Sequence, residues 1–247
     1  MPSFGKCKFC GQTKKLINAH IIPKSLYPFD SGNTKGAPLE VIHPKERRRS
    51  RSPQGEYDQK LVCLDCEKKF ARYDDYAVRF FRRNFPYTLM ERRRGNAKVY
   101  RFENFNYKNL KLFFLALLWR AGNTEREFFY NISLSPDENA ILRDSINTKD
   151  PGGRDFFSPV IVRYRDEDGL SSVMANPFGS FLRDVKFFRF YFSGFQCLIK
   201  CDSQSAHKNL FPFVLQPNQP LRVLELPFRE TKEFRNVLEA IQDLDSE

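Results

Sequence analysis

The chain has 247 residues, which is enough to bury a hydrophobic core without disulfide bonds. Hydrophobic residues make up 41% of it and include 26 phenylalanines, which excludes a disordered protein. Residues 1–100 carry 22 basic and 10 acidic side chains, whereas residues 101–247 carry 19 and 20, so the formal net charge of +11 comes from the first part. This one-sided excess suggests a surface that binds a polyanion, with a solvated basic face as the alternative.

The apolar runs are too short for a membrane span, and the longest, Leu110 to Trp119, is interrupted by Lys111 and followed by Arg120. The first ten residues lack the apolar core of a signal peptide. We therefore expect a cytoplasmic protein with no membrane partner, whose six cysteines are thiols or metal ligands. Cys197 and Cys201 fall in a predicted strand, about 13 Å apart by strand rise, so we expect them to be free and buried.

The first predicted domain covers residues 1–95 and contains two cysteine pairs. Cys7 and Cys10 precede an apolar stretch at residues 16–22. Cys63 and Cys66 precede a predicted helix, whose apolar side chains recur at three- and four-residue spacing up to residue 81. Two such pairs make a tetrahedral thiolate site that suits zinc, and four cysteines leave no coordination position open. We therefore expect a structural zinc ion.

Two clusters of arginines lie in the same domain. The first falls in the segment 29–57, which shows poor periodicity and is predicted to be an inserted loop. The second closes the domain and is predicted to be part of a linker. Both are expected to contact the phosphates of nucleic acid, which gives affinity but little sequence specificity. The clusters are Arg47, Arg48, Arg49 and Arg51, and Arg92, Arg93 and Arg94.

The second predicted domain covers residues 100–247 and is an aromatic-rich α+β domain with antiparallel strands. Ser135-Pro136-Asp137-Glu138 predicts a helix start with a capping box. Ser193-Gly194 predicts a hairpin turn. The domain is expected to recognise a substrate, a protein partner or a second copy of the chain. Further helices are predicted at 109–121, ending at Gly122, and at 231–244, and strands at 160–165, 170–174, 188–192 and 221–226.

Between the cysteine pairs lies the segment Ala19-His20-Ile21-Ile22-Pro23. Together with Leu61, both cysteine pairs and Glu67, it resembles the HNH, or ββα-metal, endonuclease family, over about the first third of the chain. The resemblance implies an α+β protein in which a ββα-metal, treble-clef zinc module precedes the second domain. It also implies metal-dependent hydrolysis of phosphodiester bonds in nucleic acid, with DNA as the expected substrate, and a place in bacterial defence or a mobile element.

The resemblance gives His20 the role of general base, with a catalytic Mg²⁺ or Mn²⁺ ion that stabilises the leaving oxygen. Many family members carry a metal ligand just before this histidine, where this chain has Ala19. The cation ligands must then come from four other carboxylates: Glu67, Asp58, Asp74 and Asp75. If none of them binds metal, the alternative is a zinc-containing protein that binds nucleic acid without cutting it. A third hypothesis is an adaptor that holds a protein partner through its second domain.

Overall fold

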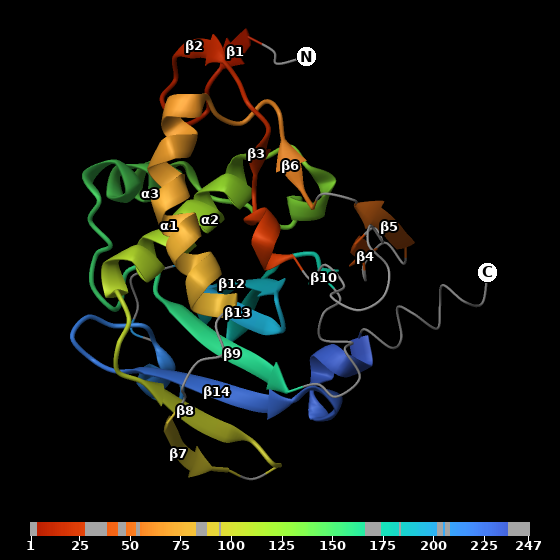
Figure 1. Ribbon diagram of the computed structural model, residues 1–247, viewed down its shortest axis with the longest axis vertical. Helices are drawn as coiled ribbons and strands as arrows, with labels where there is room; N and C mark the ends of the chain where they lie inside the picture. Colours follow the sequence, from red (N-terminus) through yellow and green to blue (C-terminus); the bar gives the residue numbers. More distant parts are fainter. Residues whose placement is uncertain are drawn as a thin grey trace.

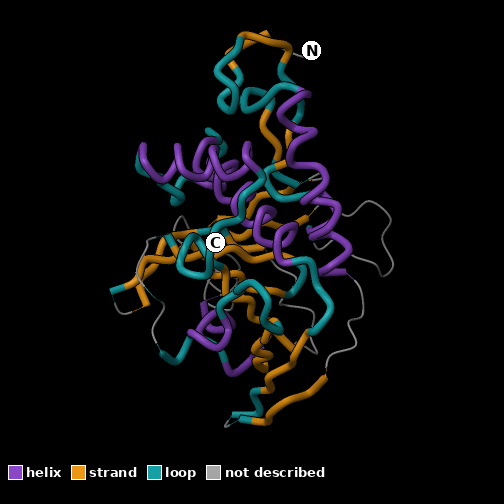
Figure 2. The backbone as a smooth tube through the Cα atoms, turned by 90° about the vertical axis from the view of Figure 1, so that its left-hand side faces the viewer, coloured by secondary structure: helices purple, strands orange, loops and turns teal. Residues whose placement is uncertain are grey.

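The computed structural model describes residues 4–27, 39–43, 48–52, 55–82, 88–93, 95–165, 174–182, 184–201, 205 and 208–236. These residues form a mixed structure in which three helices lie on one side of a seven-stranded, mostly antiparallel sheet (Figure 1). The predicted α+β class is confirmed. Hairpin β1–β2 and hairpin β7–β8 lie at opposite ends of the molecule (Figure 1, Figure 2).

The large sheet has the strand order β11-β12-β13-β9-β14-β8-β7, and only the pair β14–β9 is parallel. The predicted hairpin turn is confirmed, since Ser193 and Gly194 join β12 to β13 with positive φ angles of 51° and 74°. Two predicted strands, at 160–165 and 221–226, correspond to β9 and β14. The strands are β7 (Thr88–Arg92), β8 (Lys98–Phe102), β9 (Pro159–Arg165), β11 (Phe178–Leu182), β12 (Val185–Phe192), β13 (Phe195–Lys200) and β14 (Leu221–Pro227).

The helices are α1 (Leu64–Arg82), α2 (Tyr107–Asn123) and α3 (Pro136–Thr148). Helix α2 is central, and every side chain from Leu110 to Ala121 is buried. Gly122 lies in the last turn of this helix and not after its end. A larger residue would not fit there, because a Cβ atom at this position would collide with Leu134. The predicted capping box of α3 is confirmed: Ser135 Oγ accepts from the Glu138 amide at 3.1 Å, and Glu138 Oε2 accepts from the Ser135 amide at 2.7 Å.

The N-terminal part consists of short strands around α1. β1 (Phe4–Lys6) and β2 (Thr13–Lys15) form a hairpin, and β3 (Ala19–His20) pairs with β6 (Tyr57–Asp58). Between β3 and β6, β4 (Leu39–His43) pairs with β5 (Arg48–Ser52), and β10 (Met174–Ala175) joins β4 in parallel. The segment predicted to be a loop therefore contains a hairpin. Neither strand shows a clear alternation of apolar and polar residues, since Val41 and Ile42 are adjacent in β4 and β5 consists only of arginine and serine.

The main hydrophobic core crosses the predicted boundary between residues 1–95 and 100–247. Phe9 packs edge-on against Trp119, with ring centroids 4.9 Å apart, and Phe81 packs against Phe192 at 5.1 Å. The predicted linker is wrong where the structure describes it. Arg92 ends the sheet strand β7, and the Arg93 amide donates to Ala97 O at 2.7 Å, because the chain turns back into β8 and does not leave the sheet.

A second core cluster covers part of the sheet and includes residues of the short helices η4 (Phe211–Phe213) and η5 (Phe228–Glu230). Two further short helices, η1 (Lys24–Leu26) and η2 (Glu127–Phe129), border the N-terminal part. Residues 232–236 begin the predicted C-terminal helix, and the rest of it lies outside the described residues, as does most of the predicted strand 170–174. In the described part of the chain, no helix combines the length and apolarity that a membrane span requires.

Candidate metal centre and the surroundings of His20

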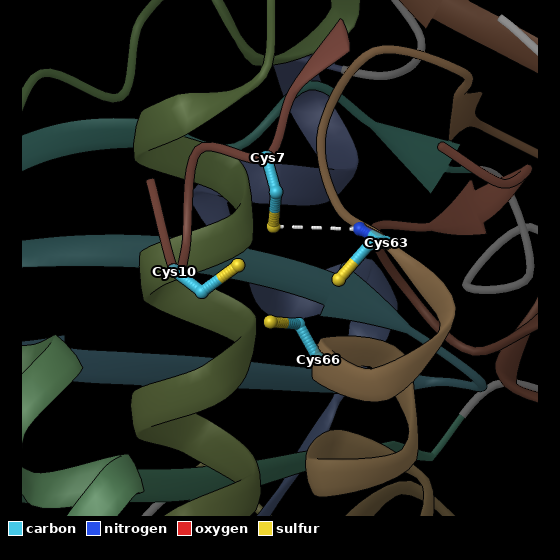
Figure 3. A group of neighbouring side chains, drawn as sticks. All are labelled: Cys7, Cys10, Cys63 and Cys66. Atoms are coloured by element: carbon cyan, nitrogen blue, oxygen red, sulfur yellow. Dashed lines mark hydrogen bonds between the residues drawn. The ribbon is translucent and has the colours of Figure 1, made fainter. Parts of the chain in front are cut away.

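Four cysteines form a cluster at the start of α1. Cys7 and Cys10 come from the turn between β1 and β2, and Cys63 and Cys66 come from the first turn of α1 and the residue before it. Their Sγ atoms all lie within 4.8 Å of one another, and the side chains point toward a common centre (Figure 3). Among the described residues, this is the one group of three or more histidine, cysteine or carboxylate ligands close enough to share an ion.

Backbone geometry explains why the two pairs meet. Gly11 has a φ of 75°, which lets the chain turn after Cys10, and its amide donates to Cys7 O at 2.8 Å. The second pair is held by the start of α1, where the Cys66 amide donates to Cys63 O at 3.1 Å. The Cys63 amide also donates to Cys7 Sγ at 3.4 Å and so joins the two pairs.

The cluster fits a metal ion such as zinc. Tetrahedral coordination with Zn–S bonds of about 2.3 Å places sulfurs about 3.8 Å apart, and the separations here are compatible with that after small rotations. Burial, followed by hydrogen bonds from the neighbouring thiols, raises the pKa of the Cys66 thiol. The Cys66 thiol thus favours its protonated form unless a cation binds it, and a divalent ion stabilises the thiolates that bind it.

His20 lies on β3 and is half-buried. In the register of β3 and β6, His20 faces Tyr57, with ring centroids 6.1 Å apart, and Ala19 faces Asp58. Because side chains alternate along a strand, Ala19 and Asp58 share one face and His20 and Tyr57 share the other. Asp58 therefore projects from the face opposite His20.

Asp58 is buried and both of its oxygens are used. Oδ1 accepts from the Lys60 amide at 2.7 Å, and Oδ2 accepts from Thr124 Oγ1 at 2.7 Å and from the Glu125 amide at 3.4 Å. Thr124 follows the last residue of α2. The carboxylate thus joins β6 to the end of α2.

Asp74 is paired with a fully buried arginine, Arg120 of α2. The guanidinium donates from Nη1 to Asp74 Oδ2 and from Nη2 to Oδ1, both at 2.7 Å, and Nη1 also donates to His20 O at 3.1 Å. Its Cζ atom lies 5.3 Å from the centre of the Phe70 ring. Burial opposes the charged form of Arg120, but the Asp74 carboxylate outweighs it and the pKa of the guanidinium is raised. A permanent cation therefore lies between β3 and α1.

Glu67 stands two helical turns before Asp74 on α1. Its Oε2 atom is buried and has no hydrogen-bond partner in the described part of the structure. Burial raises the pKa of this carboxyl group, and the charge of Arg120 partly opposes that rise. Asp75, the fourth predicted ligand, is exposed on α1. The structure thus gathers Glu67, Asp74 and the His20 carbonyl around Arg120, and it leaves Asp58 and Asp75 apart from them.

Sequence reasoning missed Arg120 as a site residue. The signal in the sequence is a cation that ends a run of ten mostly apolar residues, at a position that the helical pattern places in the core. A fully buried arginine needs a carboxylate partner. The sequence does not indicate which one, because Asp74 is 46 positions away.

The described arginines of the second cluster lie away from the cysteines. Arg92 ends β7 and Arg93 follows it, at the opposite end of the molecule from the β1–β2 hairpin (Figure 1), and Arg93 pairs with Glu91 at 2.9 Å. Arg47 and Arg94 lie outside the described residues. Of the other cluster, the structure describes only backbone: Arg48, Arg49 and Arg51 lie on β5.

Cys197 and Cys201 are buried and form no disulfide in the described part of the chain, as expected from their spacing. Comparison of the chain with protein-family models, with curated proteins and with solved structures finds no match. The geometry and chemistry of the sites described above are therefore the basis for a functional assignment.

Proposed function

We propose that the chain is a zinc-containing protein that binds nucleic acid, with DNA as the first candidate, through its N-terminal part and does not cut it. The observation that carries this proposal is the place of Arg120. Its guanidinium lies between the His20 strand and the carboxylates of α1, where an HNH-like site would need its divalent cation.

A guanidinium neutralises charge, but it offers no coordination position to water or to a phosphate oxygen. Asp74 gives both oxygens to Arg120, and Asp58 gives both to hydrogen bonds on the other face of β3–β6. Of the predicted ligands, only Glu67 keeps a buried oxygen without a partner in the described structure. Mg²⁺ is usually held by one or two carboxylates together with waters and substrate phosphates, so a lone glutamate beside a fixed cation is a poor site.

Binding of a polyanion is supported by the charge of the chain. Residues 1–100 have twelve more basic than acidic side chains, and they include the four cysteines, β3 and α1. Phosphates attract such a surface at long range and give binding that depends strongly on salt. The proposed role of zinc is structural: it would fasten the β1–β2 hairpin to the start of α1, two segments more than fifty residues apart in sequence.

The test uses the full chain with its metal content measured, and one zinc ion per chain is expected. Fluorescence anisotropy with a labelled DNA duplex, repeated with single-stranded DNA and with RNA, should show affinity that falls steeply as salt rises. Supercoiled plasmid should stay intact in Mg²⁺ and in Mn²⁺. Absence of binding to all three nucleic acids would contradict the proposal, and metal-dependent nicking would replace it with the second candidate below.

The second candidate is an HNH-like endonuclease, and the buried, unpartnered oxygen of Glu67 favours it. In this case His20 is the general base and Glu67 helps to hold Mg²⁺ or Mn²⁺. The same plasmid assay separates the two candidates. Nicking by the natural chain, lost in His20→Ala with unchanged zinc content and retained in the control Asp75→Ala, would establish the nuclease.

A further inference from the structure

A cavity of about 320 Å³ lies between α1 and the end of α3, outside the surroundings of His20. We name it the α1–α3 cavity. Its cationic walls are Lys68, Lys69 and Arg72 of α1 and Lys149, the residue that follows α3. Tyr73 and Ile146 are buried and also line it. The cavity thus combines four cationic side chains from two elements with an apolar floor.

These cations form no close ion pairs with the carboxylates that the structure describes. In the described part of the structure, none of the four lies within ion-pair distance of an acidic group. Lys69 Nζ donates to Asn147 Oδ1 at 2.7 Å, and Arg72 Nη2 makes a long hydrogen bond of 3.5 Å to Asn109 Oδ1. The one carboxylate in the lining, Asp65, is already paired with Lys14 at 2.8 Å.

The arrangement is unfavourable without an anion. Lys68 and Arg72 are four residues apart on α1, and Lys69 and Arg72 are three apart, so both pairs of like charges face each other on the helix surface and repel. Lys149 adopts a φ of 58° as the C-cap of α3, a position where glycine is the usual residue. An anion in the cavity would relieve the repulsion and be held from two sides.

We propose that the α1–α3 cavity binds a phosphate group of the nucleic-acid backbone. The inference rests on the proposed function for the source of that phosphate; the charge and shape of the cavity are equally suited to the phosphate of a free nucleotide. Lys68 and Arg72 are the main ligands, because each is exposed and neither lies within ion-pair distance of a carboxylate in the described structure, although the charge of Lys68 also acts on Asp65 from a greater distance. Lysine supplies a point charge and arginine a two-pronged donor for phosphate oxygens.

The experiment measures the affinity of the natural chain and of Lys68→Gln/Arg72→Gln for a labelled DNA duplex at several salt concentrations. The matched control is Lys208→Gln/Lys232→Gln, which removes the same charge from exposed positions in the second half of the chain. Thermal unfolding should show that all three proteins are folded, with the cavity variant as stable as the natural chain or slightly more stable, because its substitutions remove the repulsion. We expect the cavity variant to bind about tenfold more weakly, with a salt slope lower by about one or two, and the control to stay within about twofold.

If both variants bind DNA with equal affinity, the α1–α3 cavity is not a phosphate site, and the proposed function is unaffected. If the natural chain binds no nucleic acid, the proposed function fails, and calorimetric titration with adenosine monophosphate then tests the cavity alone. If the natural chain binds adenosine monophosphate and Lys68→Gln/Arg72→Gln does not, the cavity is a phosphate site whose ligand is a free nucleotide. If the natural chain does not bind adenosine monophosphate either, the proposal of a phosphate site in the cavity is wrong as well.

Discussion

Helix α2 buries two cationic side chains, and the regions around them stabilise charge in different ways. Arg120 faces the N-terminal part and has a carboxylate partner, Asp74, held by two hydrogen bonds of 2.7 Å. Lys111, nine positions earlier, donates to neutral acceptors among the residues that the structure describes: its Nζ atom donates to Ser158 Oγ at 2.7 Å and to Gly153 O at 3.0 Å. Both residues are fully buried.

The difference determines which charge is permanent. Burial lowers the pKa of Lys111 to about 7, and the nearby charge of Lys200 adds to this effect, while Asp155 and Asp150 partly oppose it. Arg120 keeps its charge because Asp74 outweighs the cost of burial. Arg120 therefore keeps its charge at any physiological pH, whereas Lys111 changes its charge near neutrality.

The largest loss of stability is expected when Arg120 loses the carboxylate of Asp74. Asp74→Asn leaves the guanidinium of Arg120 charged, buried and without a counter-ion. Breaking a buried ion pair in this way costs about 3–5 kcal/mol. Urea denaturation at neutral pH should therefore show a loss of stability of that size.

The matched control for this variant is Asp75→Asn, which removes the same charge from the adjacent exposed position. Its free energy of unfolding should stay within about 0.5 kcal/mol of the natural value. If Asp74→Asn were as mild as Asp75→Asn, the ion pair would not be what stabilises the buried guanidinium.

Lys111 should make the stability of the chain depend on pH. The folded chain holds Lys111 with a pKa of about 7, against an ordinary value of 10.5, so between these values the unfolded chain binds more protons. Stability therefore rises with pH in this window and gains nothing from Lys111 below it, where both states are protonated. Between pH 7.5 and 9.5, the gain amounts to about 2–3 kcal/mol.

Lys111→Met should abolish this rise and give a chain that is more stable than the natural one near pH 7. The measurement is the free energy of unfolding at several pH values, with the natural chain and Lys108→Met compared side by side. Lys108 is exposed on the same helix, so its replacement should keep the natural pH dependence. A natural chain whose stability is flat over this window would show that Lys111 stays charged when folded.

Local patterns in the sequence predicted the parts of the molecule that depend on near neighbours. The four-cysteine cluster depends on two short motifs, the start of α3 on the capping box at Ser135, and the β12–β13 turn on Ser193-Gly194. Each of these features has its cause within four residues, apart from the meeting of the two cysteine pairs, which the tetrahedral preference of zinc made predictable.

The rest depends on contacts between distant segments. Lys111 and Arg120 were visible only as interruptions of an apolar run, and their partners are 47 and 46 positions away. The parallel pairing of β14 with β9 and the entry of β7 into the sheet are likewise non-local. The predicted ligands Asp58 and Asp74 carry the right chemistry, but strand register and the buried arginine decide what they bind.

The smallest expected effect comes from Ser158→Ala, which removes the hydroxyl acceptor of Lys111. At pH 6 the lysine is charged, and loss of a hydrogen bond to a charged donor costs about 2 kcal/mol, whereas at pH 9 the neutral amine loses an ordinary bond of about 1 kcal/mol. Ser193→Ala is the control, since Ser193 Oγ donates to the neutral carbonyl of Leu26 at the same 2.7 Å. Urea denaturation at both pH values should give a pH-dependent loss for Ser158→Ala and a constant one for Ser193→Ala, because only Lys111 changes its charge between them. A loss at Ser158 that is equal at pH 6 and pH 9 would mean that the hydroxyl never contacts a charged amine.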